Sequence, residues 1–233
     1  MSQNQDPKEK YLIDRKEFRK RRRELIKEYN DILQEILDLP FENVMSWGLV
    51  IEGNAEKYAD NIALKFNEIE MTYREFNQIT NQYANYFLSQ GIKKGDVIEL
   101  LVSNRPELLC IITAASKIGV ISALINIDLK GDSLRNCIQK TLGKFLVVDS
   151  EVMDSFLEIY SSISLDKCDK KCYLPGMNDE DFEMPQNFEN ITEIINDFPV
   201  NNPPTTSSVK TMDYVAYVFT SGTTGLPKAA IRT

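Results

Sequence analysis

The amino-acid sequence predicts an α/β fold, in which a parallel sheet is flanked by helices and preceded by a charged helical leader. Strand and helix patterns alternate from residue 61 to residue 160, several strands are apolar along their whole length, and turn residues separate the elements. The 233 residues are 42% hydrophobic and 27% charged, which is typical of folded domains and excludes disorder over the whole length.

The start of the chain differs from the rest, and we expect a leader at residues 1–40 and a domain at residues 41–233. Eight basic and two acidic side chains lie within residues 15–27, and apolar side chains then recur at helical spacing until Pro40. We therefore expect a helix over residues 15–37. Two interpretations stay open: a solvated helix whose later turns dock on the domain, or a basic amphipathic helix that contacts an anionic membrane surface.

Two short strands and an amphipathic helix are expected first in the domain. Residues 62–66 and 69–73 have strand patterns and are joined by Asn67 and Glu68. Thr72 and Glu75 then form the T-x-x-E pattern of a capping box, which begins a helix. The apolar residues of its inner face recur at helical spacing, and a glycine follows as the expected end: Phe76, Ile79, Tyr83, Phe87, Leu88 and Gly91.

Residues 108–127 are mostly apolar and long enough to suggest a membrane span. Lys117 lies in the middle of this stretch, however, with small and turn-forming residues beside it. We instead expect a helix capped by Asn104, with Pro106 in its first turn, that ends after Lys117. A buried strand is then expected at residues 120–125.

The other elements follow the same rhythm of strands and helices. Further strands are expected at three apolar runs, residues 97–102, 145–148 and 214–219. Further helices are expected at residues 133–142, ended by Gly143, and at residues 151–160. Residues 178–202 are acidic and show little strand pattern, so we expect a surface connection with one helical turn near residues 191–195.

Composition excludes several kinds of chemistry. The chain has no histidine, so a histidine metal ligand or a Ser-His-Asp triad is excluded within it. A net charge of −8 argues against nucleic acid as a partner. Cys110 and Cys137 stand in apolar helical patterns, and Cys168 and Cys172 form one C-x3-C pair. We therefore expect free thiols in a reducing cytoplasm and no zinc site.

The residues that carry chemistry follow the last strand. Nine consecutive positions contain four hydroxyls, two glycines and one lysine: Thr220, Ser221, Gly222, Thr223, Thr224, Gly225, Leu226, Pro227 and Lys228. Glycines let backbone amides turn toward an anion, hydroxyls add donors, and lysine adds a mobile positive charge. The spacing differs from a Walker A loop, because Pro227 stands where the second glycine is required. We expect a polyphosphate site rather than a simple turn.

Residues 217–228 resemble the signature phosphate loop of the adenylate-forming (AMP-binding) superfamily. Two earlier segments are also similar to elements of that superfamily, M-T-Y-R-E-F at residues 71–76 and K-G-D at residues 94–96. Residues 123–129 and 132–138 resemble the branch that contains fatty acid transport proteins and very-long-chain acyl-CoA synthetases. The resemblance implies the N-terminal part of the large domain of these enzymes.

The resemblance also implies a two-step reaction that uses ATP, Mg²⁺ and CoA. A long- or very-long-chain fatty acid becomes an acyl-adenylate and then an acyl-CoA. The loop at residues 220–228 would hold the β- and γ-phosphates, and the Thr220 hydroxyl would help to coordinate Mg²⁺. Other members of the superfamily continue well beyond position 233 with their main catalytic groups, so this chain is expected to be an N-terminal piece without activity of its own.

Two alternatives stay open at this point. One is a fatty-acid uptake protein at the membrane, and the other is a non-catalytic remnant of an enzyme. The expected location is cytoplasmic. Peripheral contact of residues 15–37 with the inner face of a membrane is a further interpretation that stays open.

Overall fold

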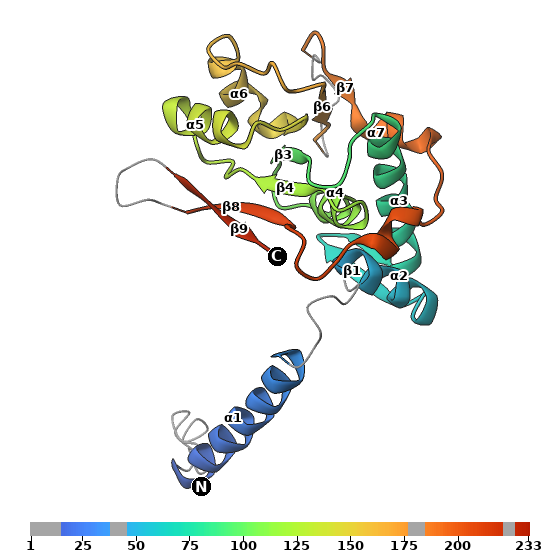
Figure 1. The fold of residues 1–233 in the computed structure, drawn as a ribbon, viewed down its shortest axis with the longest axis vertical. Helices are drawn as coiled ribbons and strands as arrows, with labels where there is room; N and C mark the ends of the chain where they lie inside the picture. Colours follow the sequence, from blue (N-terminus) through green and yellow to red (C-terminus); the bar gives the residue numbers. More distant parts are fainter. Residues whose placement is uncertain (1–14, 38–45, 177–184, 221–226) are drawn as a thin grey trace, which may run out of the picture. The chain divides into compact units, whose positions relative to one another are not determined.

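The computed structural model describes residues 15–37, 46–176, 185–220 and 227–233. The chain divides into two compact units, Met1–Asn43 and Val44–Thr233. Helix α1, Arg15–Leu37, lies in the first unit (Figure 1). Across the described ranges, no helix combines the length and the apolar character that crossing a membrane requires.

A mostly parallel sheet forms the centre of the second unit (Figure 1). In the described part of the chain this sheet has seven strands in the order β7-β6-β5-β3-β4-β8-β9. All neighbouring strands are parallel except β8 and β9. The strands span Val97–Leu101 (β3), Ile121–Leu124 (β4), Phe145–Asp149 (β5), Lys170–Leu174 (β6), Glu189–Asn190 (β7), Ala216–Thr220 (β8) and Lys228–Arg232 (β9).

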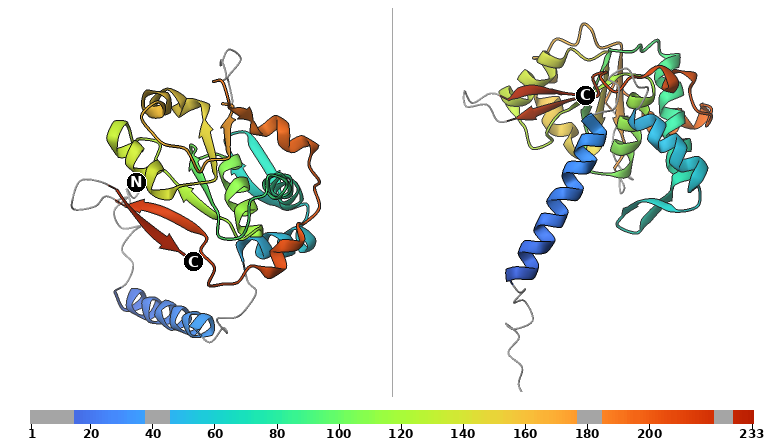
Figure 2. Two further views of the ribbon diagram at one scale, coloured as in Figure 1. Left: turned by 45° about the horizontal axis from the view of Figure 1, so that its top comes forward. Right: turned by 60° about the horizontal axis from the view of Figure 1, so that its bottom comes forward.

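Helices cover both faces of this sheet (Figure 2). One face carries α2 (Trp47–Lys57), α3 (Tyr73–Ser89) and α4 (Pro106–Lys117). The other face carries α5 (Gly131–Thr141) and α6 (Met153–Tyr160). Short helical turns complete the unit at Ser150–Val152, Ile191–Ile194 (α7), Ile195–Asp197 and Pro204–Ser208. The predicted α/β fold with a parallel sheet between helices is therefore confirmed.

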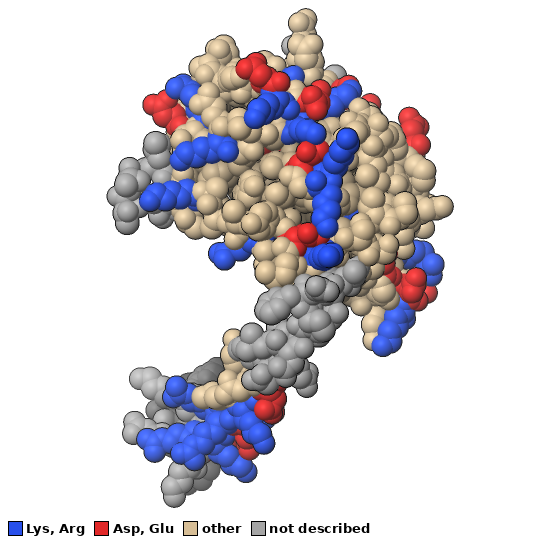
Figure 3. Space-filling model, in the orientation of Figure 1, with Lys and Arg blue, Asp and Glu red and all other residues tan. Residues whose placement is uncertain are grey.

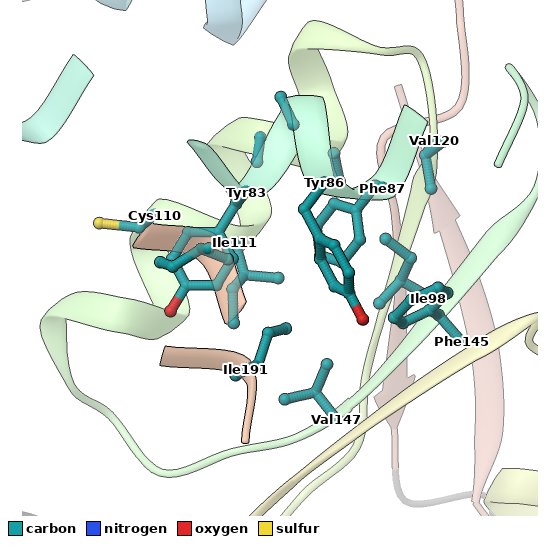
Figure 4. Close-up of a cluster of buried hydrophobic side chains, with 14 of the residues drawn as sticks. Tyr83, Tyr86, Phe87, Ile98, Cys110, Ile111, Val120, Phe145, Val147 and Ile191 are labelled. Atoms are coloured by element: carbon teal, nitrogen blue, oxygen red, sulfur yellow. The ribbon is translucent and has the colours of Figure 1, made fainter. Parts of the chain in front are cut away.

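The alternation of side chains along the central strands separates two hydrophobic cores. Ile98 and Leu100 of β3 pack with α3 and α4, whereas Leu101 packs with α5 and α6. Figure 4 shows the first core, in which the Tyr86 ring of α3 meets the Phe145 ring of β5 edge-on, with centroids 5.7 Å apart. Because β3 and β5 are covered on both faces, their sequences are almost continuously apolar.

The hairpin and the helix that follow α2 agree with the sequence pattern. β1 (Ile62–Phe66) and β2 (Ile69–Thr72) are antiparallel, and the turn between them places Asn67 at a φ of 51°. The Thr72 hydroxyl accepts a hydrogen bond from Glu75 N at 3.2 Å, and the Glu75 carboxylate accepts one from Thr72 N at 2.8 Å. The predicted capping box is confirmed.

Two predicted helix ends are wrong by one residue. The N-cap of α4 is Arg105, not Asn104, because extended backbone at Arg105 (φ −150°) continues up to the first helical residue, Pro106. The residue that ends α5 in the left-handed region is Leu142, with a φ of 50°, not Gly143.

Three strands were not expected from the sequence. β6 and β7 extend the sheet beyond β5, and β9 pairs with β8 at the opposite edge. In the expected surface connection at residues 178–202, the helical turn predicted near residues 191–195 is confirmed as α7. The rest of the expectation is wrong for residues 185–202, because Phe188 and Ile191 are buried there and β7 joins the sheet. Residues 178–184 lie outside the described residues. Short strands with charged side chains have too little alternating pattern to be recognised locally.

Candidate functional site

The glycine- and hydroxyl-rich loop connects β8 to β9. β8 lies beside β4 in parallel register from Ser122↔Ala216 to Leu124↔Val218, and β9 returns antiparallel to β8. The last residue pair of this hairpin is Thr220↔Lys228. The first and last polar residues of the loop are therefore opposite each other at its base. Five of the expected phosphate-binding residues lie outside the described residues: Ser221, Gly222, Thr223, Thr224 and Gly225.

The described base of the loop combines hydroxyl and ammonium groups. The Thr220 hydroxyl donates to the Lys228 carbonyl oxygen at 3.5 Å, and both side chains are exposed. From α5, the Lys140 ammonium donates to the Pro227 carbonyl oxygen at 3.4 Å. Figure 3 shows Lys and Arg side chains over α5 and the β8–β9 hairpin on this face. Sequence reasoning missed Lys140, because 87 residues separate it from Pro227 and no local pattern connects them.

A mostly apolar cavity adjoins this hairpin at the carboxyl ends of β3, β4 and β8. Its volume is about 370 Å³, and its lining includes the apolar residues Leu100, Leu124, Val218 and Phe219 and the polar residues Asn104, Asn126 and Asp128. The helix after β3 covers one face of the sheet and the helix after β4 covers the other. In open α/β sheets, ligands bind where neighbouring connections diverge in this way. The loop therefore lies beside the part of the sheet that favours a ligand.

Two of the other family-like segments, residues 71–76 and 94–96, lie away from the hairpin and have structural roles. The Asp96 carboxylate accepts hydrogen bonds from Lys93 N at 2.8 Å and from the Lys144 ammonium at 2.8 Å. The same turn contributes Lys94, which forms an ion pair with Asp213 at 2.5 Å. This turn stands at the amino end of β3, whereas the loop follows the carboxyl end of β8. The segment at residues 71–76 provides the capping box of α3.

A buried carboxyl group lies under α5. Glu99 on β3 is 1% exposed, and its Oε1 accepts hydrogen bonds from the Thr141 hydroxyl and from Gly143 N. Burial raises the pKa of Glu99 to about 7, although these hydrogen bonds act in the opposite direction. Among the described residues, its Oε2 has no hydrogen-bond partner. Glu99 shares a cavity of about 150 Å³ with Gly143 and Cys168, away from the loop.

The cysteines do not provide a reactive group in the described structure. Burial raises the pKa of Cys137 and of Cys168 to about 11 and the pKa of Cys172 to about 12, so these thiols stay protonated at neutral pH. Over the described ranges, no three acidic, cysteine or histidine side chains come together as metal ligands.

Thr220 is the residue that the resemblance assigns to Mg²⁺ coordination. Its hydroxyl is exposed at the mouth of the loop and could supply one oxygen ligand. Mg²⁺ keeps several water ligands and in phosphate sites is held mainly by substrate phosphates and one or two protein oxygens. The chemistry of Thr220 is therefore compatible with Mg²⁺ that arrives with a nucleotide, and not with a metal held by the protein alone.

The sequence of this chain is similar to that of a known family and of proteins with known names. The model of a family described as AMP-binding enzyme matches residues 51–233. The medium/long-chain-fatty-acid–CoA ligase FadD6 of Mycobacterium tuberculosis is 29% identical over 188 residues, which cover 81% of this chain and 29% of that protein. The mouse long-chain fatty acid transport protein 6 is 35% identical over 167 residues, which cover 69% of this chain and 25% of that protein. The chain thus spans between a quarter and a third of the length of these two relatives.

Solved structures share the fold. The anthranilate CoA ligase AuaEII, in complex with anthranoyl-AMP, superposes with a TM-score of 0.72 and 22% identity over 83% of this chain and 35% of that chain. The N-terminal domain of FACL13 from Mycobacterium tuberculosis, bound to an inhibitor, superposes with a TM-score of 0.65 and 20% identity over 82% of this chain and 44% of that chain. The expected fold, the N-terminal part of the large domain of adenylate-forming enzymes, is confirmed.

Proposed function

The chain belongs to the family of AMP-binding enzymes, and we propose from this premise that it supplies the phosphate-binding part of an enzyme that activates long-chain fatty acids with ATP. The names of its relatives support the substrate class, because they include a medium/long-chain-fatty-acid–CoA ligase and long-chain fatty acid transport proteins. In this function the fatty acid first forms an acyl-adenylate and then an acyl-CoA.

The single observation that carries the proposal is the β8–β9 hairpin. It places Thr220 opposite Lys228 at the base of a loop rich in glycine and hydroxyl groups, beside a mostly apolar cavity at the carboxyl ends of the strands. A site that joins charged phosphate donors to an apolar space suits a reaction between ATP and a fatty acid.

In the proposed mechanism, the fatty acid carboxylate attacks the α-phosphorus of ATP and pyrophosphate leaves. The Lys228 ammonium, the Thr220 hydroxyl and the backbone amides of residues 221–225 would bind the β- and γ-phosphates. Their contribution is to hold the leaving group in line and to stabilise its growing negative charge. Mg²⁺, when bound with ATP, would neutralise part of the phosphate charge next to Thr220. The thiolate of CoA then displaces AMP from the acyl-adenylate.

The test replaces Lys228 by Ala in an enzyme that contains this chain. A charge-assisted hydrogen bond contributes about 1.5–3 kcal/mol, so ATP–pyrophosphate exchange should fall on the order of tenfold to a hundredfold. Lys130→Ala is the control, because Lys130 is an exposed lysine at the N-terminal end of α5 and is not part of the proposed phosphate site. This variant should leave ATP–pyrophosphate exchange unchanged. Unchanged exchange after Lys228→Ala would contradict the assignment of the loop. If the unsubstituted enzyme shows no ATP–pyrophosphate exchange, the alternative of a non-catalytic remnant would be favoured.

A second candidate function, fatty-acid uptake at a membrane, is favoured by helix α1. Lys and Arg side chains cover its first half (Figure 3), while Leu25, Ile26 and Tyr29 are between 49% and 64% exposed. We propose that residues 15–37 make peripheral contact with an anionic membrane surface on its cytoplasmic side, where the fold would convert an imported fatty acid into its thioester. Sedimentation of the 233-residue chain with phosphatidylserine vesicles should exceed sedimentation with phosphatidylcholine vesicles. Equal sedimentation would remove this candidate.

A further inference from the structure

Lys117 is a charged side chain in the interior of the second unit. It is the last residue of α4 and its side chain is 0% exposed. Its ammonium nitrogen has three N–H donors and lies within hydrogen-bonding distance of side-chain oxygens on three other segments. These are Glu52 Oε1 at 2.9 Å, Asn77 Oδ1 at 2.7 Å, Asn81 Oδ1 at 2.7 Å and Asn202 Oδ1 at 3.3 Å. A buried ammonium persists only when such acceptors replace its water shell.

The packing around Lys117 preserves this arrangement. A Cβ atom at Gly48 would lie 2.6 Å from Lys117 Cγ, so the glycine allows α2 to approach α4 closely. Ser116 Oγ accepts from Gly48 N at 3.2 Å. Burial lowers the pKa of Lys117 from its usual value, and the Glu52 carboxylate acts in the opposite direction. The ammonium is thus enclosed by helices on the same side of the sheet.

The third of these segments, which contains Asn202, is residues 199–209, and we name it the strap. Amide side chains of α3 form hydrogen bonds with the backbone of the strap. Asn81 Nδ2 donates to the Val200 carbonyl oxygen at 2.7 Å, and Asn85 Nδ2 donates to the Pro199 carbonyl oxygen at 2.8 Å. Further along, the Thr205 hydroxyl donates to the Lys117 carbonyl oxygen at 3.1 Å. Lys117 therefore binds the strap through its ammonium and through its backbone.

The strap determines how the chain reaches β8. β7 is at one end of the described sheet and β8 is near the other, so the chain has to cross one face of the molecule between them. Figure 1 shows this orange-to-red segment passing α3 and α2 before it enters β8. β8 itself is joined to β4 by only three residue pairs, Ser122↔Ala216, Ala123↔Tyr217 and Leu124↔Val218. Because so few pairs join β8 to β4, we expect the strap to contribute to holding the β8–β9 hairpin in position.

We propose that Lys117 is a positioning residue for the β8–β9 hairpin, acting through the strap, which sets where β8 enters the sheet. The inference rests on the proposed function only for the assignment of Thr220 and Lys228, which end this hairpin, as phosphate-binding residues. The hydrogen bonds of the Lys117 ammonium go to α2, α3 and the strap, so its effect on β8 is transmitted by Asn202 and the strap.

Amide hydrogen exchange on the 233-residue chain, without nucleotide, tests whether Lys117 and the strap hold the β8–β9 hairpin in place. In Lys117→Met, amides of β8 and β9 should exchange about tenfold faster, the equivalent of ~1.4 kcal/mol, while amides of β3 and β5 keep their rates within about twofold. Asn202→Ala should give a smaller effect with the same pattern. Asn196→Ala is the control, because Asn196 bonds only the Thr192 carbonyl oxygen in the described structure and should leave β8 unchanged.

Two results would overturn the proposal. Unchanged exchange in β8 and β9 would show that the strap does not hold the hairpin, and equal acceleration in all strands would show that Lys117 serves only general stability. If Lys117→Met does not fold, the pattern in Asn202→Ala decides the question.

A second measurement connects the strap to catalysis. In ATP–pyrophosphate exchange by an enzyme that contains this chain, Asn202→Ala should raise the KM for MgATP several-fold and leave the KM for the fatty acid unchanged. A change in kcat alone would contradict positioning. If the proposed function is wrong, ATP–pyrophosphate exchange will not change in Lys228→Ala. Hydrogen exchange in β8 and β9 will still depend on Lys117 in that case.

Discussion

Gly143 shows how one residue can be correctly noticed in the sequence and wrongly explained. The sequence predicts it as the glycine that ends a helix, but the left-handed residue there is Leu142. The structure gives another reason for the glycine: a Cβ atom at position 143 would lie 2.6 Å from Glu99 Cγ. The absence of a side chain also lets Gly143 N reach the Glu99 carboxylate at 3.1 Å. A contact over 44 residues cannot be seen in a local pattern.

Glu99 leads to a prediction about stability and pH. Burial raises its pKa from 4.5 to about 7, so the folded chain binds the proton more tightly than the unfolded chain does. The stabilisation is complete below pH 4.5 and is lost as the pH rises through about 7, by an amount on the order of 3 kcal/mol. Glu99→Gln stays neutral and should lack this loss.

Urea unfolding of both chains at pH 5 and pH 8 measures the effect of Glu99. The wild-type free energy of unfolding should fall more between these two values than that of Glu99→Gln. Parallel pH dependence in the two chains would show that other groups cause the fall.

At the scale of elements, those with strong local signals are the ones that the sequence predicts. The capping box of α3 and the apolar strands β3 and β5 each depend on residues within a few positions of one another. β6 and β9 depend instead on a neighbouring strand that is distant in the sequence, and their charged first residues, Lys170 and Lys228, hide the strand pattern. β6 lies between β5 and β7 and β9 lies at the edge, and each becomes a strand only where a neighbouring strand supplies its backbone hydrogen-bond partners.

The capping box gives a prediction at this scale. Thr72→Ala removes the hydroxyl that accepts from Glu75 N, and the free energy of unfolding should fall by about 1 kcal/mol. The backbone N–H of Thr72 lowers the pKa of Glu75 most and the Thr72 hydroxyl lowers it further, so loss of the hydroxyl should bring the pKa part of the way back up in the variant. Urea unfolding and NMR titration measure the two effects. Gln78→Ala, an exposed change on the same helix, should alter neither.

At the scale of the whole molecule, the order of the strands places the loop. β8 joins the sheet beside β4, and this puts Thr220 and Lys228 next to the cavity at the carboxyl ends of β3 and β4. The strap and Lys117 then connect this edge to the helices on one face. The site is thus a product of the topology, in which segments more than 80 residues apart are brought together.

A prediction for the whole chain concerns nucleotide binding. The 233-residue chain should bind MgATP weakly, in the millimolar range or above, and should form no acyl-adenylate. The proposed loop supplies phosphate donors, but the chain covers only 29% of the ligase relative and 25% of the transport-protein relative, so it offers only part of the surface that a protein of their length could offer a nucleotide. Each loop residue fixed by the ligand also costs about 1–2 kcal/mol of conformational entropy. Titration calorimetry with MgATP measures the affinity, and a micromolar value or detectable acyl-adenylate would contradict the prediction.

The sequence by itself determined the fold class, the family and the position of the glycine- and hydroxyl-rich loop that we propose binds phosphate. These depend on local patterns: alternating elements, apolar strands, a capping box and nine consecutive residues of defined chemistry. Only the tertiary structure decided that Lys140 reaches the loop, that Gly143 makes room for Glu99, and that Lys117 is buried. In the sequence Lys117 is only an argument against a membrane span. Its role depends on oxygens from three other segments, and only the folded chain brings those oxygens within hydrogen-bonding distance.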